Sequence, residues 1–143
     1  MRRLRNESGQ MTIEFVVAFP VLLAIALIAV NVTLFLSDCS GFDRAFREEV
    51  CSLAPSPAYG EDQSDIAGKV EKSLSEAFDQ DYLDVEVTAS GGAGGLVTYE
   101  GTLTFSPTLF GEGRLTGAFG VSFPRIEHEQ RIVIDAYKPG VLL

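Results

Sequence analysis

The segment Gly9–Leu36, GQMTIEFVVAFPVLLAIALIAVNVTLFL, decides the fold of this chain of 143 residues. From Phe15 to Leu36 it holds 22 residues without a charge. A helix rises about 1.5 Å per residue, so this run is long enough to cross the roughly 30 Å hydrocarbon core of a bilayer. No other stretch of the sequence is both long enough and apolar enough to do so. The segment therefore predicts a single membrane-spanning helix.

Charge is distributed unevenly on the two sides of this segment. The leader, residues 1–9, has a net charge of +2 from Arg2, Arg3, Arg5 and Glu7. The rest of the chain carries 8 basic against 19 acidic side chains, a net charge of −11. By the positive-inside rule, we expect the N-terminus in the cytoplasm and the acidic body outside. Nucleic-acid binding requires a basic patch, so the composition argues against a nucleic-acid partner.

A carboxylate, Glu14, stands directly before the uncharged run and five residues after Gly9. A charge in a membrane segment costs roughly 2.5–3.5 kcal/mol at the helix centre and less towards the ends, so its presence indicates a function. The pattern G-Q-M-T-I-E-F, followed by Val16–Leu23, resembles the class III signal of type IV pilin-like proteins. It is most similar to the TadE/TadF pseudopilins of tight-adherence pili. The resemblance extends from Gly9 to about Leu36.

This resemblance implies how the chain is processed and where it works. In that family a prepilin peptidase cuts after the glycine, here Gly9, and Gln10 becomes the new N-terminus. Glu14, followed by Phe15, would set the register of assembly. The implied function is that of a minor pilin-like structural subunit. Its partners would be the peptidase, other pilin-like subunits, the pilus assembly platform and membrane lipid. The head would lie outside the inner membrane, at the cell surface or in the pilus after assembly.

Three other interpretations of the N-terminus remain open. A secretory signal peptide would end near residues 24–26 (Ala-Ile-Ala), but the apolar run continues past them. A lipoprotein signal would need small residues before its cysteine, whereas Asp38 precedes Cys39. A plain single-pass anchor for an unprocessed extracytoplasmic binding domain explains the length and the orientation. It does not explain the spacing of Gly9 and Glu14.

The helix is expected to run from about residue 11 to residue 53. Pro20 removes the hydrogen bond to the Val16 carbonyl and predicts a kink, which is either merely tolerated or helps a subunit to leave the bilayer. Beyond the span, one helical face is apolar and the other is charged, with Asp43 and Arg47 as an i,i+4 pair. The apolar face consists of Phe42, Phe46, Val50 and Leu53.

Two cysteines, Cys39 and Cys51, test this long helix. Twelve helical residues place their Cα atoms about 18 Å apart, far beyond the roughly 7 Å that a disulfide allows. Two free thiols are therefore expected if the helix is continuous. A Cys39–Cys51 disulfide, which an exported compartment permits, would require the helix to unwind near Gly41.

After the helix, residues 54–63 are expected to form a linker and residues 64–143 an extracytoplasmic head. Residues 65–79 have a helical apolar stripe, and Ser64 or Asp65 is a candidate cap. Alternating apolar residues predict strands over 85–89, 97–105, 118–123 and 128–137. The expected fold class is therefore α+β, with a long membrane-spanning helix followed by one amphipathic helix on an antiparallel sheet. The stripe of the second helix consists of Ile66, Val70, Leu74 and Phe78.

Residues that carry chemistry are sparse. His128 is the only histidine and stands between two glutamates in a predicted strand, which is typical of a surface residue. Asp79, Asp81 and Asp84 lack the glycine and glutamate that an EF-hand loop requires. The sequons at Asn6 and Asn31 fall in the leader and the span and are read as chance matches. We therefore expect neither catalytic activity, nor a metal site, nor any other cofactor.

Overall fold

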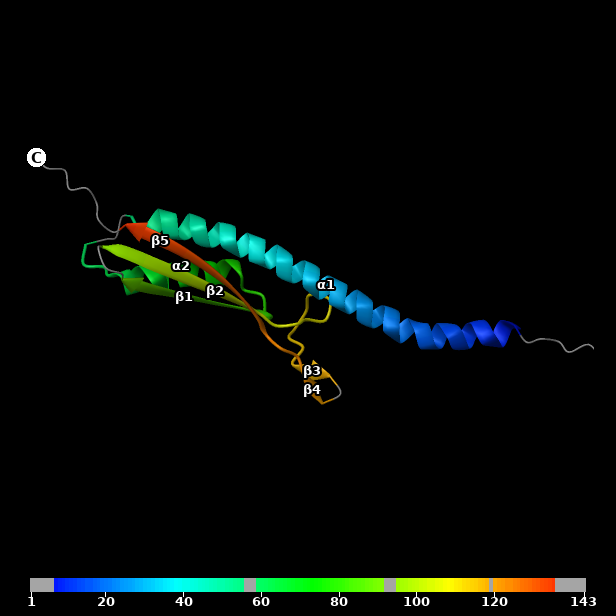
Figure 1. Cartoon of the computed structure of the whole chain (residues 1–143). Coiled ribbons are helices and arrows are strands. Elements are labelled where there is room, and N and C mark those ends of the chain that lie inside the picture. The colour runs from blue at the N-terminus through cyan, green and yellow to red at the C-terminus, as the bar shows by residue number, and fades with distance from the viewer. Residues whose placement is uncertain (1–6, 56–58, 92–94, 119, 136–143) are drawn as a thin grey trace, which may run out of the picture.

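A computed structural model describes residues 7–55, 59–91, 95–118 and 120–135, without the side chains of residues 7–10. Its longest element is the helix α1, whose C-terminal part packs on a small head while its N-terminal part projects away (Figure 1). The head contains a second helix and five strands in the described ranges. The elements are α1 (Glu7–Leu53), α2 (Gln63–Ala77), β1 (Leu83–Gly91), β2 (Leu96–Phe105), β3 (Gly117–Ala118), β4 (Val121–Ser122) and β5 (Ile126–Asp135).

The head is a two-layer α+β unit, as the sequence predicts. β1, β2 and β5 form an antiparallel sheet in the order β1-β2-β5, with Ala89, Tyr99 and Ile132 side by side in register. The alternation along β2 is strict, because every second residue from Val97 to Phe105 is buried. Both helices contact the sheet, α2 mainly through β1 and α1 through β2 and β5. The opposite face is polar, with an ion pair of 3.0 Å between Arg131 and Glu100.

The hydrophobic core crosses the predicted division between helix and head. Phe42, Phe46 and Val50 of α1 have no solvent exposure, which confirms the predicted face, and they belong to the same core cluster as Val70 and Tyr99. Placing the head entirely after residue 53 therefore omits part of its core. The physical reason is that α2 covers mainly β1, so β2 and β5 need α1 to bury their apolar side chains.

A glycine in the central strand allows this close packing. Gly101 is buried in β2, and a Cβ atom placed there would lie 2.7 Å from Phe46 Cε2 and 3.0 Å from Phe42 Cζ. Real Cβ contacts are essentially never as short as the first of those distances. The two phenylalanine rings are stacked, with centroids 5.7 Å apart. Gly101 thus provides the flat surface on which α1 rests.

The start of α2 corrects the predicted cap. The N-cap is Asp62, not Ser64 or Asp65, and its carboxylate accepts hydrogen bonds from the backbone N–H groups of Ser64 and Asp65. Asp65 is the third residue of the helix and accepts in return from the Asp62 N–H, so the two form a capping box. Hydrogen bonds, first from the Ser64 hydroxyl and then from the Asp65 N–H, lower the pKa of Asp62.

The strand predicted over 118–123 is wrong. The chain instead folds into the small hairpin β3–β4, with Gly117 paired to Ser122 and Ala118 to Val121. Gly120 has a φ of 80°, a conformation that glycine adopts readily, and the chain reverses direction there. The sequence around it is largely apolar and therefore predicted one continuous strand. The last strand begins at residue 126, two residues earlier than predicted. Its predicted end at 136–137, like the centre of the glycine connection at 92–94, lies outside the described residues.

Substituting Gly101 with alanine should destabilise the head, because the new methyl group would displace the two phenylalanine rings. Overpacking of this kind costs about 1–3 kcal/mol. Gly68→Ala is the matched control, since Gly68 lies in α2, a Cβ atom added there would meet nothing within 4 Å, and the helix should gain about 0.5–1 kcal/mol. Chemical denaturation of both variants measures the two changes. A Gly101→Ala variant as stable as the parent would contradict the packing.

Truncation separates the predicted head from the observed one. A fragment of residues 54–143 lacks Phe42, Phe46 and Val50 and should be unfolded, because each buried phenylalanine removed costs about 3–5 kcal/mol. A fragment of residues 37–143 retains these side chains and should fold. Circular dichroism and limited proteolysis of both fragments provide the comparison. Equal protease resistance would restore the division at residue 53.

Candidate membrane anchor and its junction with the head

The N-terminal part of α1 is a bare apolar helix. Its most apolar window of 18 residues has no buried residue, and by length and composition alone the helix is able to cross a membrane. Every residue from Met11 to Ala26 is exposed. A helix that is apolar on all sides and buried in nothing needs an apolar environment from outside the chain. The large exposed side chains include Phe15, Val16, Val17, Phe19, Val21, Leu22, Leu23, Ile25 and Ile28.

The residues singled out by the pilin-like pattern all lie on this helix. Gly9 and Gln10 belong to its first turn, and nothing is described of the Gln10 side chain. Most of the predicted leader, residues 1–6, lies outside the described residues. Glu14 is exposed, and the exposed ring of Phe15 packs against Phe19 with centroids 5.7 Å apart. The helix continues unbroken through Pro20 and is curved along its length (Figure 1).

Asn31 of α1 is hydrogen-bonded to the head at Thr108. The Asn31 side-chain amide donates to the backbone carbonyl of Thr108 at 2.9 Å, and the Thr108 N–H donates to the Asn31 Oδ1 at 2.7 Å. Asn31 also donates to the carbonyl of Leu27 in its own helix at 2.9 Å. The Thr108 hydroxyl donates to the Glu112 carbonyl. We call this pair of hydrogen bonds between residues 31 and 108 the Asn31 clamp.

The Asn31 clamp corrects the predicted extent of the free helix. The uncharged run ends at Leu36, but Asn31, within that run, is already hydrogen-bonded to the head. Beyond the clamp, the Phe35 ring meets Phe105 edge-on with centroids 5.6 Å apart. The interpretation of residues 31–33 as a chance sequon gave the Asn31 side chain no role, although it binds Thr108. The available signal was an asparagine in an otherwise apolar helix, because a polar amide there needs a partner.

Asp38, one helical turn after Phe35 in α1, is partly buried. The Asp38 Oδ2 atom is buried and has no hydrogen-bond partner in the described part of the chain. Burial raises the pKa of Asp38. Burial, together with the negative charge of Asp38, also raises the pKa of the neighbouring Tyr82 hydroxyl.

Both cysteines are free thiols on one continuous helix. Cys39 is buried and Cys51 is exposed. Burial is the main reason that the pKa of Cys39 is raised, and the charges of Asp43 and Asp38 raise it further. Cys39 therefore stays protonated and unreactive at neutral pH, because the thiolate is the reactive form.

His128 ties the last strand to α1. Its Nε2 lies 2.7 Å from the Asp43 carboxylate, and its ring meets Phe42 edge-on with centroids 6.4 Å apart. Asp43 thus faces β5 rather than forming the predicted pair with Arg47. The ion pair on this part of the helix surface joins Arg44 and Glu48, 3.0 Å apart and exposed. The sequence shows His128 as an ordinary strand residue, because only the packing of β5 beside α1 brings Asp43 near it.

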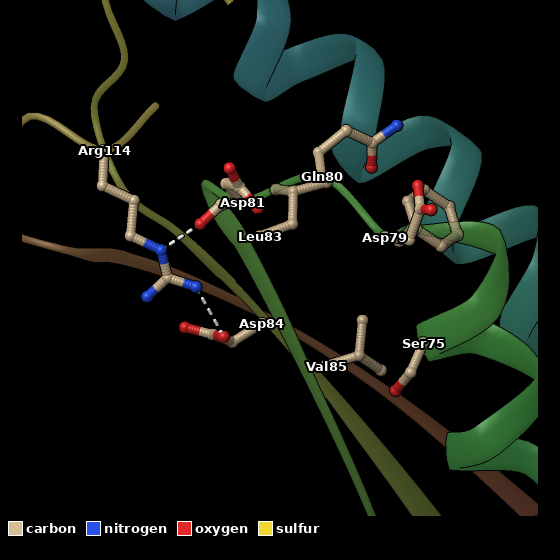
Figure 2. Close-up of a pocket in the computed structure, with 9 residues that line it drawn as sticks. Ser75, Asp79, Gln80, Asp81, Leu83, Asp84, Val85 and Arg114 are labelled. Carbon is tan, nitrogen blue, oxygen red and sulfur yellow. Dashed lines mark hydrogen bonds and ion pairs between the residues drawn. The ribbon is translucent and has the colours of Figure 1, made fainter. Parts of the chain in front are cut away.

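The three aspartates considered for calcium line an open pocket of about 660 Å³ (Figure 2). Arg114 reaches into it, donates to the backbone carbonyl of Asp81, and forms an ion pair of 2.7 Å with Asp84. The hydrogen bond with Asp84 is the main cause that raises the pKa of Arg114. Among the described residues no group of three His, Cys, Asp or Glu side chains has the arrangement of a metal site. The Arg114 guanidinium thus provides a positive charge beside the aspartates that line the pocket.

Comparison of the chain with protein-family models, with curated proteins and with solved structures found no match.

Replacing Asn31 with leucine should release the loop after β2 from α1. The two backbone groups of Thr108 would lose their partners, and leaving buried groups unsatisfied costs about 1–3 kcal/mol. Amide hydrogen exchange at Thr108 should accelerate, while exchange in β1 should change far less. Thr33→Leu is the control, since the Thr33 hydroxyl donates to the carbonyl of Ala29 within its own helix. Unchanged exchange at Thr108 in Asn31→Leu would contradict the clamp.

Proposed function

We propose that this chain is a minor pilin-like structural subunit, a pseudopilin similar to those of tight-adherence pili, processed after Gly9 by a prepilin peptidase. The observation that carries the proposal is the division of α1 into two halves. The N-terminal half exposes apolar side chains all round, and the C-terminal half contributes Phe42, Phe46 and Val50 to the core of the head. A single helix thus serves as both the proposed membrane anchor and the central support of the exported head.

The bare half of α1 suits a subunit that exchanges lipid for protein. In a bilayer, lipid tails would cover its apolar side chains. In a filament, the same side chains would pack against the equivalent helices of neighbouring subunits, where association depends on van der Waals packing. Its large exposed side chains, among them Phe15 and Phe19, provide the surface for such packing.

The position of Gly9 suits cleavage. It is the third residue of α1, and the first four N–H groups of a helix have no intrahelical partner. Opening this turn into an extended strand therefore sacrifices few hydrogen bonds. Glycine has no side chain to obstruct a narrow peptidase cleft. The arginines of the leader would hold the scissile bond at the cytoplasmic surface.

Glu14 would act after cleavage. Removal of residues 1–9 frees a positively charged amine on Gln10, and Glu14 lies about one helical turn further along the axis. The Glu14 of an entering subunit would pair with the amine of a neighbour. Each charge is costly in an apolar surrounding, so pairing offsets both desolvation penalties and fixes the axial register.

Two variants separate processing from assembly. Gly9→Val should accumulate a precursor that is heavier by the nine leader residues, because the branched side chain obstructs the cleft. Glu14→Ala should still be cut but should fail to enter the assembly, because the register pair is lost. Immunoblots of cell fractions, with mass spectrometry of the mature N-terminus, measure both effects in cells that express the peptidase and the assembly platform.

Ile13→Ala is the control for Glu14→Ala. It truncates the adjacent exposed side chain of the same helix without removing a charge, so it should be processed and should still enter the assembly, which Glu14→Ala should not. If Gly9→Val and Glu14→Ala both behave like the parent, the pilin-like function is wrong. The chain would then be an unprocessed, membrane-anchored extracytoplasmic binding domain.

A further inference from the structure

The head exposes apolar side chains on the side that points along α1 towards its N-terminus. They lie at the start of β5 and in the segment between β2 and β5, which includes the hairpin β3–β4 and extends past the end of the three-stranded sheet (Figure 1). Phe110 is 58% exposed and Val121 66% exposed. We call this surface the apolar rim, and it consists of Leu109, Phe110, Val121, Phe123 and Ile126.

The sequence of the apolar rim is unlike the rest of the acidic head. Leu115–Pro124 contains ten residues without a charge, and an arginine stands at each end. Arg114 is engaged by Asp84, whereas Arg125 is exposed. An apolar, aromatic segment with a neighbouring exposed cation suits the boundary between acyl chains and anionic headgroups.

One residue of the rim is held in a conformation that aromatic residues rarely adopt. Leu109 and Glu112 enclose a tight turn, with the Glu112 N–H donating to the Leu109 carbonyl at 3.2 Å. The two central residues, Phe110 and Gly111, have φ angles of 55° and 88°. Turns of this kind favour asparagine or glycine at the first of these positions. The fold here presents a large apolar side chain to the exterior at a conformational cost, which points to a role for that side chain.

The Asn31 clamp fixes the height of the rim along α1. The turn that carries Phe110 follows Thr108 directly, and a Cβ atom on Gly111 would lie 3.9 Å from Leu34. If the hydrocarbon core begins at Phe15, about 20 helical residues cross its roughly 30 Å and bring its far boundary to about Leu34. The turn is therefore level with the outer surface of the membrane that α1 would cross.

We propose that the apolar rim inserts into the outer headgroup–acyl boundary of this bilayer and forms a second membrane contact beside α1. The inference rests on the proposed function, because it requires α1 to span the membrane. Lipid is the occupant because the turn that carries Phe110 is held beside Asn31 and Leu34, at the level where the bilayer crossed by α1 would end. The two contacts together would fix the tilt of the head relative to the membrane.

Tryptophan reporters test this contact, since the chain contains no tryptophan. The full-length variants Phe110→Trp and Val121→Trp are reconstituted into phosphatidylcholine–phosphatidylglycerol vesicles whose acyl chains carry bromine near the headgroup. Bromine quenches only tryptophans that lie close to it. Phe19→Trp, within the bare half of α1, reports the span, and the fully exposed Tyr59→Trp reports the far end of the head. Unbrominated vesicles provide the reference for each variant.

We expect both rim reporters and Phe19→Trp to lose fluorescence in brominated vesicles, while Tyr59→Trp keeps it. Rim reporters that behave like Tyr59→Trp, beside a quenched Phe19→Trp, would overturn the rim contact and leave the anchor intact. A rim reporter that is shielded from aqueous iodide but not quenched by bromine would place protein on the rim and also overturn the inference. An unquenched Phe19→Trp would refute the spanning helix itself, and the rim contact with it.

Discussion

The contact between α1 and Gly101 is the constraint on which the head depends. A three-stranded sheet and a helix of 15 residues leave β2 and β5 partly uncovered, and Phe42 and Phe46 of α1 complete that layer. They approach so closely that any side chain at Gly101 would displace them. Because these phenylalanines belong to the same helix as the bare apolar segment, the packing that completes the core also attaches that segment to the head.

The Asn31 clamp determines where one half of α1 ends and the other begins. Hydropathy changes gradually along this helix, but the hydrogen bonds to Thr108 mark a definite position. Every residue from Met11 to Ala26 is exposed, whereas beyond the clamp Phe35 packs against Phe105 and one face of the helix enters the core. The clamp also satisfies the backbone polar groups of Thr108, which would otherwise be costly at the edge of an apolar surrounding.

For a subunit that is proposed to leave the bilayer and join a filament, a rigid link between anchor and head has a mechanical consequence. α1 continues from the bare segment into the core without a break, so a force applied to the head is transmitted along the helix. His128 and Asp43 add a contact between the last strand and the same helix. The orientation of the head therefore follows the orientation of the helix.

The sequence by itself determined the elements whose signals are local. The uncharged run fixed the long helix, the spacing of Phe42, Phe46 and Val50 fixed its buried face, and alternation fixed β1, β2 and β5. The pattern from Gly9 to Glu14 provided the functional hypothesis, which needs no fold to be stated. The tertiary structure alone decided that Asp43 meets His128, that Arg114 meets Asp84 and that Asn31 holds Thr108. These partners lie between 30 and 85 residues apart, and only the packing of strands beside α1 brings them within hydrogen-bond distance.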